Sequence, residues 1–454
     1  MGIQGFSGRV TAVASELPFP AEPAKEERLE RNLTLRIMRK IIIAAMLGNG
    51  LEWYDYALYA YTTLIISKLF FPVGNEAAHL LATLGIFAVG FVARPFGGIL
   101  FGVIGDRFGR RTALVTSIFM MAIPTGCIGL LPTYAMIGLW APALLTFIRI
   151  LQGLSLGGAF SGSITFLVEH SPPRRRGLIG SFSLASLVIG FLLGSVIAAL
   201  VKAPLSDAQY ESWGWRIPFL LGVGIGFIGL YIREHCEESP TYEAAKLDGS
   251  LSERPVRDAL KHELHHMAQA VGIYLSVTMP FYLLSAYFIT FTEHNLGRSK
   301  EEALVLNSIN MLIVLVMVIA SAWLSDRVGR KKVLVYGALF FLLGSYPLFT
   351  LLLQPGFMPI LLAQGLFAAI VGFYTGPVPA LLVELFPTRI RYTGMALSYN
   401  ISAALFGGTA PMVCQWLLSS TSNSYSIAWY VMACAAVSLI TLFFYRDRHL
   451  EELR

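Results

Sequence analysis

Charged residues are scarce in this sequence of 454 residues. Asp, Glu, Lys and Arg make up only 14% of it, whereas hydrophobic residues make up 55% and the mean hydropathy is +0.64. An ordinary soluble domain carries about 25% charged residues. The composition therefore excludes a soluble protein and indicates a polytopic membrane protein.

Motifs for catalysis and metal binding are also lacking. The sequence contains no GxxxxGK[ST] loop, no HExxH element and no nucleophile elbow, so an ATP-driven pump is unsupported. The four cysteines are scattered without the spacing of a metal site. His262, His265 and His266 cluster in a central polar stretch, but a metal site there has little support. We therefore predict no enzyme activity and no bound metal.

Twelve apolar segments account for most of the chain. Six precede and six follow a polar stretch of about 34 residues, and the polar N-terminal segment lacks the apolar core of a cleavable signal peptide. With approximate boundaries, the apolar segments are 38–66, 77–104, 112–131, 137–168, 179–201, 216–233, 268–292, 303–325, 333–353, 357–384, 394–418 and 424–445. We expect an N-terminal segment (1–37), a six-helix half (38–233), a central loop (234–267), a second six-helix half (268–445) and a tail (446–454).

The distribution of Lys and Arg predicts the orientation. If the N-terminus is cytoplasmic, 27 of the 34 basic residues fall on the cytoplasmic side and five on the other. This bias places both termini, the central loop and the tail in the cytoplasm of a bacterial-type inner membrane. It also explains the net charge of +6 without nucleic acid as a partner.

Two charged motifs occur twice. GDRFGRR at 105–111 returns as SDRVGRK at 325–331, an offset of 220 residues. The segment from Glu169 to Arg176 returns from Glu384 to Arg391, an offset of 215. Nearly equal offsets indicate a six-helix unit used twice, which is typical of rocking transporters with a site between the halves. The predicted fold is therefore an all-α membrane protein with twelve transmembrane helices in two six-helix halves.

These motifs carry a family resemblance. The two loops at 105–111 and 325–331, with RILQG at 149–153, resemble the major facilitator superfamily. GNGLEWYDYALYAY at 48–61, GFVARPFGG at 90–98, EHSPPRRRG at 169–177, WGWRIPF at 213–219 and FPTRIRYTG at 386–394 more narrowly resemble the metabolite:proton symporter family. That family includes carriers of proline/betaine, citrate, shikimate and oxoglutarate. The resemblance implies proton-coupled solute import by alternating access, with protons as the coupling ion and no other cofactor.

Two acidic residues, Glu52 and Asp55, lie inside the first apolar segment. A carboxylate in the bilayer core costs roughly 2.5–3.5 kcal/mol, so both should face protein or water. At helical spacing Asn49, Tyr56 and Tyr59 share a stripe with Glu52, and Asp55 lies beside it. Glu52 and Asp55 are therefore candidates for proton coupling, with a structural pairing to a neighbouring helix as the alternative. Asn49, Tyr56 and Tyr59 are candidates for substrate binding.

Two arginines are also embedded in apolar segments. Arg149 shares a helix face with Gln152, and its guanidinium stays charged, so it needs a carboxylate partner or an anionic ligand. The resemblance implies a role of this R-x-x-Q-G element in proton coupling. The residues alone leave three alternatives: Arg149 modulates a first-span acid, binds a substrate carboxylate bidentately, or forms a structural ion pair. Gln152 is a candidate for substrate binding. Arg94, which precedes Pro95, is a candidate for substrate contact or for a structural or gating role.

Later segments add further substrate-binding candidates. Tyr282 lies on an aromatic stripe with Tyr274 in the seventh segment, and the eleventh segment carries Tyr399 and Asn400. Asn310 lies in the eighth. Aromatic faces suit a quaternary ammonium ion through cation–π contact, although such stripes more often serve helix packing. We name Tyr282, Asn310 and Asn400 as candidates.

The repeated charged loops are candidates for a conformational latch. The resemblance assigns the GDRFGRR loop to closure of one face of the transporter, and the second pair of motifs supplies further charges. The predicted latch residues are Gly105, Asp106, Arg107, Gly109, Arg110, Glu169, Arg176, Asp326, Arg327, Arg330, Glu384 and Arg391.

We therefore expect a secondary active transporter that imports a small polar organic solute, such as an organic acid, an amino acid or a betaine-like molecule, together with protons. An exporter of the same superfamily and a membrane solute sensor without transport are the alternatives. The expected partners are the solute and membrane lipid, and we expect a monomer.

Overall fold

The computed structural model describes residues 76–234 and 238–453 and, from the first expected span, residues 42, 43, 45, 46, 49–59, 62, 65, 66 and 68–71. All regular structure in these residues is helical. The expected N-terminal segment, 1–37, lies outside the described residues.

The first half begins with the helical residues 49–59. Its further elements are α3 (Glu76–Arg107), α4 (Arg110–Leu130), α5 (Tyr134–Ile137), α6 (Trp140–Glu169), η1 (Pro173–Arg175), α7 (Arg176–Lys202), α8 (Asp207–Gln209), η2 (Tyr210–Gly214) and α9 (Arg216–Glu234).

Two short helices, α10 (Pro240–Leu247) and α11 (Pro255–His262), connect the halves. The elements of the second half are α12 (Leu264–Tyr282), η3 (Leu283–Tyr287), α13 (Phe288–His294), α14 (Lys300–Val328), α15 (Arg330–Leu352), α16 (Phe357–Thr375), α17 (Val378–Leu385), α18 (Arg391–Ser402), η4 (Ala403–Gly407), α19 (Ala410–Thr421) and α20 (Tyr425–Phe444).

Ten helical stretches of the described chain are long and apolar enough to cross a membrane. They coincide with ten of the twelve apolar segments expected from the sequence. Of the other two, the sixth coincides with α9, and residues 49–59 lie within the first.

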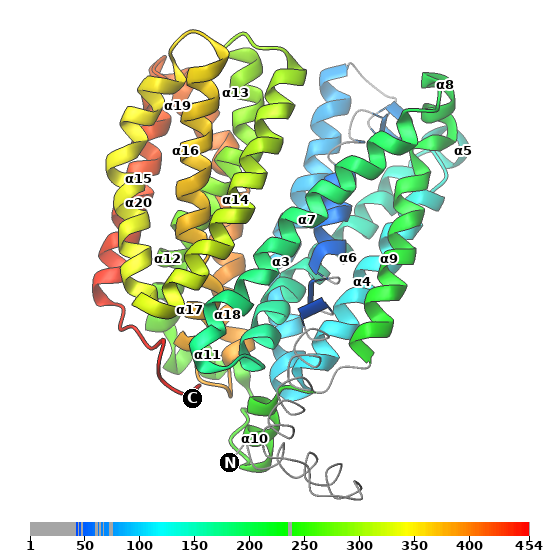
Figure 1. The fold of residues 1–454 in the computed structure, drawn as a ribbon. Coiled ribbons are helices and arrows are strands. Elements are labelled where there is room, and N and C mark those ends of the chain that lie inside the picture. The colour runs from blue at the N-terminus through cyan, green and yellow to red at the C-terminus, as the bar shows by residue number, and fades with distance from the viewer. Residues whose placement is uncertain are drawn as a thin grey trace, which may run out of the picture.

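The two halves lie side by side, with α3 to α9 on one side of the molecule and α12 to α20 on the other (Figure 1). Across the boundary α3 packs against α18, and α7 packs against α14. The helices α10 and α11 lie at the same end of the molecule as the end of the chain after α20 (Figure 1). We call this end the loop face.

Glycines bring α3 and α6 into backbone contact. A Cβ atom at Gly157 would lie 2.1 Å from the carbonyl oxygen of Arg94, and one at Gly153 would lie 2.3 Å from that of Gly90. Because these are backbone atoms, a side chain at either glycine would force the helices apart. The contact places Arg94 and Arg149, which lie on these two helices, near the middle of the molecule.

Two spans of the second half change helix type where they meet the first half. The π-helical turns η3 and η4 follow α12 and α18 without a break. Such turns occur frequently at functional sites. Tyr282 immediately precedes η3 and Ala403 begins η4, and both residues line the cavity described below.

Candidate transport site and latch

Asp55 is the centre of a buried hydrogen-bond network. One of its carboxylate oxygens accepts from Nη1 of Arg149 at 2.8 Å, and the other accepts from Nε2 of Gln152 at 2.9 Å. Arg149 Nη1 also donates to Oε1 of Gln152 at 2.7 Å, and Gln152 donates to the hydroxyl of Thr125 at 3.0 Å. The network joins the first span, α4 and α6. Of the alternatives for Arg149, the structure therefore contains the contact with a first-span acid.

Aromatic rings shield this network. The Cζ atom of Arg149 lies 3.7 Å from the centre of the Tyr59 ring and 5.5 Å from that of Tyr56. Glu52 is also fully buried, but Arg149 pairs with Asp55 rather than with Glu52. The structure thus brings five of the predicted residues together: Asp55, Tyr56, Tyr59, Arg149 and Gln152. Thr125 is an additional member, and nothing in the sequence marked it out from other threonines in apolar segments.

Arg94 occupies a different position, at the boundary between the halves. Its side chain is fully buried, and its guanidinium donates from Nη2 to the hydroxyl of Tyr399 at 2.9 Å and from Nη1 to that of Tyr282 at 3.4 Å. Its Cζ atom lies 5.7 Å from the centre of the Trp53 ring and 5.0 Å from that of Phe91. Arg94 therefore contacts both halves, whereas the hydrogen bonds of Arg149 to the described residues stay within the first half.

A cavity lies between the halves beside Arg94. Aromatic and aliphatic side chains make up most of its lining. Its walls come from the first span, α6 and α7 of the first half and from α12, α14, α16, α18 and η4 of the second. The lining residues are Trp53, Phe160, Leu184, Leu187, Val188, Tyr274, Val277, Thr278, Phe281, Tyr282, Val314, Val318, Thr375, Tyr399 and Ala403.

A second cavity adjoins the first. Both are lined by Phe281, and the second also touches Phe191, Ser285 and Asn307. The elements η3 and α13 and the first turns of α14, which contribute to it, lie toward the end of the molecule opposite the loop face (Figure 1). The second cavity therefore lies on the side of the first that faces away from the loop face.

The side-chain amides of three predicted substrate-binding asparagines donate hydrogen bonds to neighbouring helices. Asn49 donates to the carbonyl oxygen of Ser183 at 2.6 Å, and Asn400 donates to that of Gly157 at 2.6 Å. Asn310 donates to Gln364 at 2.9 Å. None of the three lines the cavity between the halves.

The first latch contact joins the end of α3 to the start of α18. The carboxylate of Asp106 accepts hydrogen bonds from the backbone N–H groups of Tyr392 at 3.2 Å and Thr393 at 2.9 Å. Arg110 donates to the same carboxylate at 2.6 Å. A negative charge is favoured at a helix N-terminus. Asp106 of the first half therefore caps a helix of the second half.

Glu169 adds an ion pair to this contact. It accepts from Arg391 of the second half at 2.7 Å and from Arg110 of the first half at 3.4 Å. The hydroxyl of Ser239, the N-cap residue of α10, also donates to Glu169. All three charged side chains are buried.

The second latch contact has the same arrangement as the first, with the roles of the two halves swapped. Asp326, at the end of α14, accepts from the backbone N–H groups of residues 177–178 at the start of α7, both at 2.8 Å. Arg330 donates to Asp326 at 2.7 Å and to Glu384 at 3.2 Å. Arg176 lies 3.9 Å from Glu384. With both contacts formed, the halves are joined at the loop face.

The other predicted latch residues contribute differently. Gly105 lies in the contact, and Gly109 has a φ of +107°, a left-handed value that disfavours any side chain. Arg107 and Arg327 have exposed side chains and lie outside the ion-pair network. Arg327 instead stacks over the ring of Trp323 at 3.7 Å.

Two helix-capping acids on the loop face were missed from the sequence. Glu238 accepts from the backbone N–H groups of Arg110 at 3.0 Å and Arg111 at 3.2 Å, at the start of α4. Asp447 accepts from that of Lys331 at 2.8 Å, at the start of α15. The two acids follow the sixth and the last span and are 209 residues apart, a separation that matches neither repeat offset, so the repeats gave no signal for them.

Two tyrosines outside the spans, Tyr242 and Tyr445, are buried at the loop face. The hydroxyl of Tyr242 donates to the backbone carbonyl of Arg107 at 2.9 Å, and burial raises the pKa of Tyr242. Burial also raises the pKa of Tyr445 well above its usual value. Both side chains are therefore neutral and serve packing.

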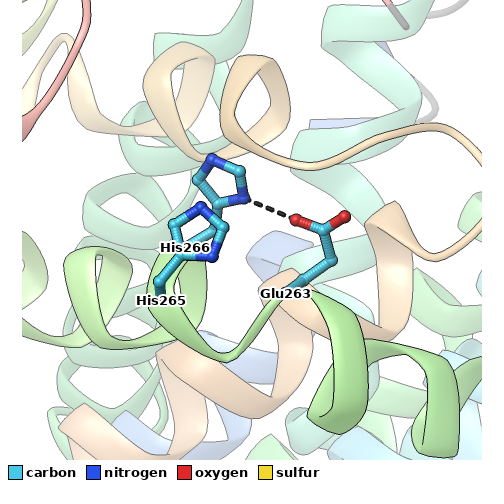
Figure 2. A group of neighbouring side chains, drawn as sticks. All are labelled: Glu263, His265 and His266. Atoms are coloured by element: carbon cyan, nitrogen blue, oxygen red, sulfur yellow. Dashed lines mark hydrogen bonds and ion pairs between the residues drawn. The ribbon is translucent and has the colours of Figure 1, made fainter.

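Glu263, His265 and His266 lie close together where α11 meets α12, as Figure 2 shows. Their potential ligand atoms all lie within 4.8 Å of one another. Nδ1 of His266 lies 2.5 Å from a carboxylate oxygen of Glu263, and the two imidazole rings are 3.8 Å apart. The hydrogen bond between Glu263 and His266 links the end of α11 to the first turn of α12.

Comparison with known proteins agrees with this architecture. A family model described as "Sugar (and other) transporter" matches residues 40–279 and 282–453. The glycine betaine/proline/ectoine/pipecolic acid transporter of Dickeya dadantii (strain 3937) is 35% identical over 421 residues, which cover 90% of this chain and 83% of the relative. The proline/betaine transporter of Escherichia coli (strain K12) is 36% identical over 422 residues, which cover 89% of this chain and 82% of the relative.

A solved structure shares the fold. The proton:xylose symporter of the major facilitator superfamily, bound to 6-bromo-6-deoxy-D-glucose, matches with a TM-score of 0.76 at 21% sequence identity, covering 91% of this chain and 97% of that chain. This likeness confirms the predicted fold class. The relatives are transporters rather than enzymes, as predicted from the absence of catalytic motifs. From the extent of these matches, the chain belongs to the sugar (and other) transporter family within the major facilitator superfamily and is a multi-pass integral membrane protein.

Proposed function

We propose that this chain imports a small polar organic solute together with protons, by alternating exposure of one cavity to the two sides of the membrane. The buried ion pair of Asp55 and Arg149 within the first half is the observation that carries the proposal. The names of the two relatives make proline and glycine betaine the first solutes to test.

The coupling follows from the electrostatics of a buried ion pair. Removing one charge of such a pair leaves the other uncompensated, which is strongly unfavourable. Protonation of Asp55 removes its charge and weakens its hold on Arg149 and Gln152. The first half then rearranges around Arg149, and this rearrangement ties proton binding to the change of access. Glu52, one turn earlier and equally buried, is a second proton-binding candidate.

The orientation follows from the positive-inside rule. The basic residues at the ends of α3 and α14 place the loop face, both termini and the segments 234–267 and 446–454 in the cytoplasm of a bacterial-type inner membrane. The two latch contacts close the cytoplasmic side, and the second cavity lies toward the outside. We propose that the protein works as a monomer in lipid and binds no nucleic acid.

Purified protein in liposomes tests this function. With an inward proton gradient, the wild type should accumulate labelled glycine betaine or proline above the external concentration. Asp55→Asn should abolish this uphill accumulation, because an amide cannot release a proton. Exchange of internal for external solute should persist in the variant, since that half-cycle does not require proton release.

Glu211→Gln is a matched control. Glu211 is an acid on η2 that pairs with Lys68 at 2.9 Å on the exposed surface, away from the Asp55 network. We expect this variant to accumulate solute as the wild type does. Full uphill accumulation by Asp55→Asn would overturn the coupling role. Accumulation driven outward in everted vesicles would identify an exporter, and binding without any flux would identify a sensor.

A further inference from the structure

Four basic side chains from two segments of the chain gather in one hollow at the loop face. The hollow lies between the end of α3 and the short helix α11, and its basic residues are Arg107, Arg254, Arg257 and Lys261. All four side chains are exposed, and none of them forms a hydrogen bond or an ion pair with a described residue. The four cations are therefore available to a ligand from outside the protein.

Acidic residues do not match this positive charge. No Asp or Glu lines the hollow. The segment that carries three of the cations, residues 252–262, contains two acids, Glu253 and Asp258. Glu253 is exposed, and the carboxylate of Asp258 accepts a hydrogen bond from the hydroxyl of Ser252 at 2.5 Å. The hollow therefore keeps an excess of positive charge, which favours an anionic ligand.

The helix α11 is held in place on its other side. Pro255 and Ala259 are its buried residues, and the helix packs against both α3 of the first half and α18 of the second. Arg257 and Lys261 are four residues apart, so they lie on one face of the helix, one turn from each other. The packing of α11 therefore fixes a helix face with two cations beside Arg107 of α3.

The membrane side of the hollow is apolar. The span in α3 ends at Arg107, so Arg107 lies at the edge of the bilayer and Val103 lies one turn inside it. Val103 and the half-exposed Leu260 both line the hollow. A free phosphate ion would use only the cations, whereas a phospholipid would use the cations with its headgroup and the apolar residues with an acyl chain. Basic pockets at the cytoplasmic ends of spans are typical sites for anionic headgroups.

We propose that the hollow between α3 and α11 binds one anionic phospholipid of the cytoplasmic leaflet. The phosphate lies among the four cations, and an acyl chain lies against Val103 and Leu260. Because α11 contacts both halves, the bound lipid lies where the halves meet at the closed loop face. The site goes beyond the proposed transport function and uses only the orientation given there.

Native mass spectrometry of the purified full-length protein in detergent tests the proposal, because it counts the lipids bound to each molecule. The probes are dioleoyl phosphatidylglycerol, dioleoyl phosphatidylcholine and glycerol 1-phosphate. The wild type should bind one phosphatidylglycerol at least about tenfold more tightly than phosphatidylcholine, whose ammonium group offsets its phosphate. Glycerol 1-phosphate has no acyl chain to bury, so it should compete only at concentrations about a hundredfold higher.

A triple variant separates this site from the general positive charge of the loop face. Arg254→Gln, Arg257→Gln and Lys261→Gln together should weaken phosphatidylglycerol at least about tenfold and leave phosphatidylcholine within about twofold. The matched control combines Arg174→Gln, Arg175→Gln and Lys332→Gln. It removes three exposed cations that do not line the hollow, so phosphatidylglycerol should bind within about threefold of the wild type.

Equal binding of the two lipids by the wild type would overturn the proposal. Equal losses in the two triple variants would also overturn it, since they would show a general attraction to the basic face. Competition by glycerol 1-phosphate at the concentration of the lipid would identify a site for free phosphate instead. If the triple variant fails to fold, Lys261→Gln alone decides, with a loss of at least about threefold expected. The assay uses no proton gradient, so a failure of coupling through Asp55 would leave its outcome unchanged.

Discussion

Asp106 and Asp326 stand at equivalent places in the two halves, and each caps a helix of the opposite half. Asp106 of the first half accepts from the backbone at the start of α18, and Asp326 of the second accepts from the backbone at the start of α7. Each half thus supplies a carboxylate to a helix of the other half, and the two contacts together join the halves. Opening of the loop face has to break both.

The first prediction concerns the strength of this closure. Asp106→Asn and Asp326→Asn should each weaken the closed state by about 1.5–3 kcal/mol, because each replaces charge-assisted hydrogen bonds with weaker ones. Distances between spin labels on the loop-face ends of the two halves should show a larger open population. Arg327→Gln is the control, since Arg327 is exposed and lies outside the network. Unchanged distance distributions in both aspartate variants would contradict the latch.

The second prediction concerns the buried charges behind the first contact. Glu169→Gln leaves Arg391 and Arg110 buried without their shared carboxylate. Breaking a buried pair by removing one partner typically costs 3–5 kcal/mol. We expect a clearly lower thermal unfolding temperature in detergent and reduced yield. Glu243→Gln, which changes an exposed acid on α10, should unfold as the wild type does.

A third prediction tests the backbone contact between α3 and α6. Gly157→Ala places a methyl group where Arg94 contributes a backbone oxygen 2.1 Å away, so the helices have to separate. We expect loss of both stability and solute binding. Gly224→Ala is the matched control, because nothing lies within 4 Å of the new methyl group and alanine favours a helix by about 1 kcal/mol. Normal solute binding by Gly157→Ala would mean that the two helices tolerate separation.

The fourth prediction concerns the capping acid after the last span. Asp447→Asn weakens a carboxylate cap at the start of α15, so we expect a loss of about 0.5–1 kcal/mol in stability. Because the effect of a charge at a helix terminus is screened by salt, the difference from the wild type should shrink at high ionic strength. Glu452→Gln, near the end of the same tail, should show neither effect. A difference that does not respond to salt would point to lost packing instead.

The charged contacts at the loop face were predictable from the sequence because their parts are repeated. Four charged motifs at two nearly equal offsets marked Asp106, Asp326, Glu169 and Glu384, and all four take part in contacts between or beside the halves. Glu238 and Asp447 are 209 residues apart, so neither repeat offset leads from one to the other. Arg107 and Arg327 share the motifs but point to solvent, and spacing alone does not reveal which arginine of a loop turns inward.

The transport site was less predictable, because it depends on how helices are rotated and packed. Spacing placed Glu52 and Asp55 on neighbouring faces, and only the approach of α6 selects Asp55 as the partner of Arg149. Asn310 and Asn400 have the polarity of ligand-binding residues, yet they bond to neighbouring helices. Trp53 was passed over although it follows Glu52 directly, because a tryptophan in an apolar segment has no periodic signal that separates packing from binding.

All members of the Asp55 network lie on the first half, whereas the groups around Arg94 come from both halves. In the proposed cycle a proton on Asp55 is held by one half alone, whereas a solute in the cavity touches both halves, and one of them has to release it before it can leave. Separation of the halves would then time the departure of the solute, and rearrangement within the first half would time the departure of the proton.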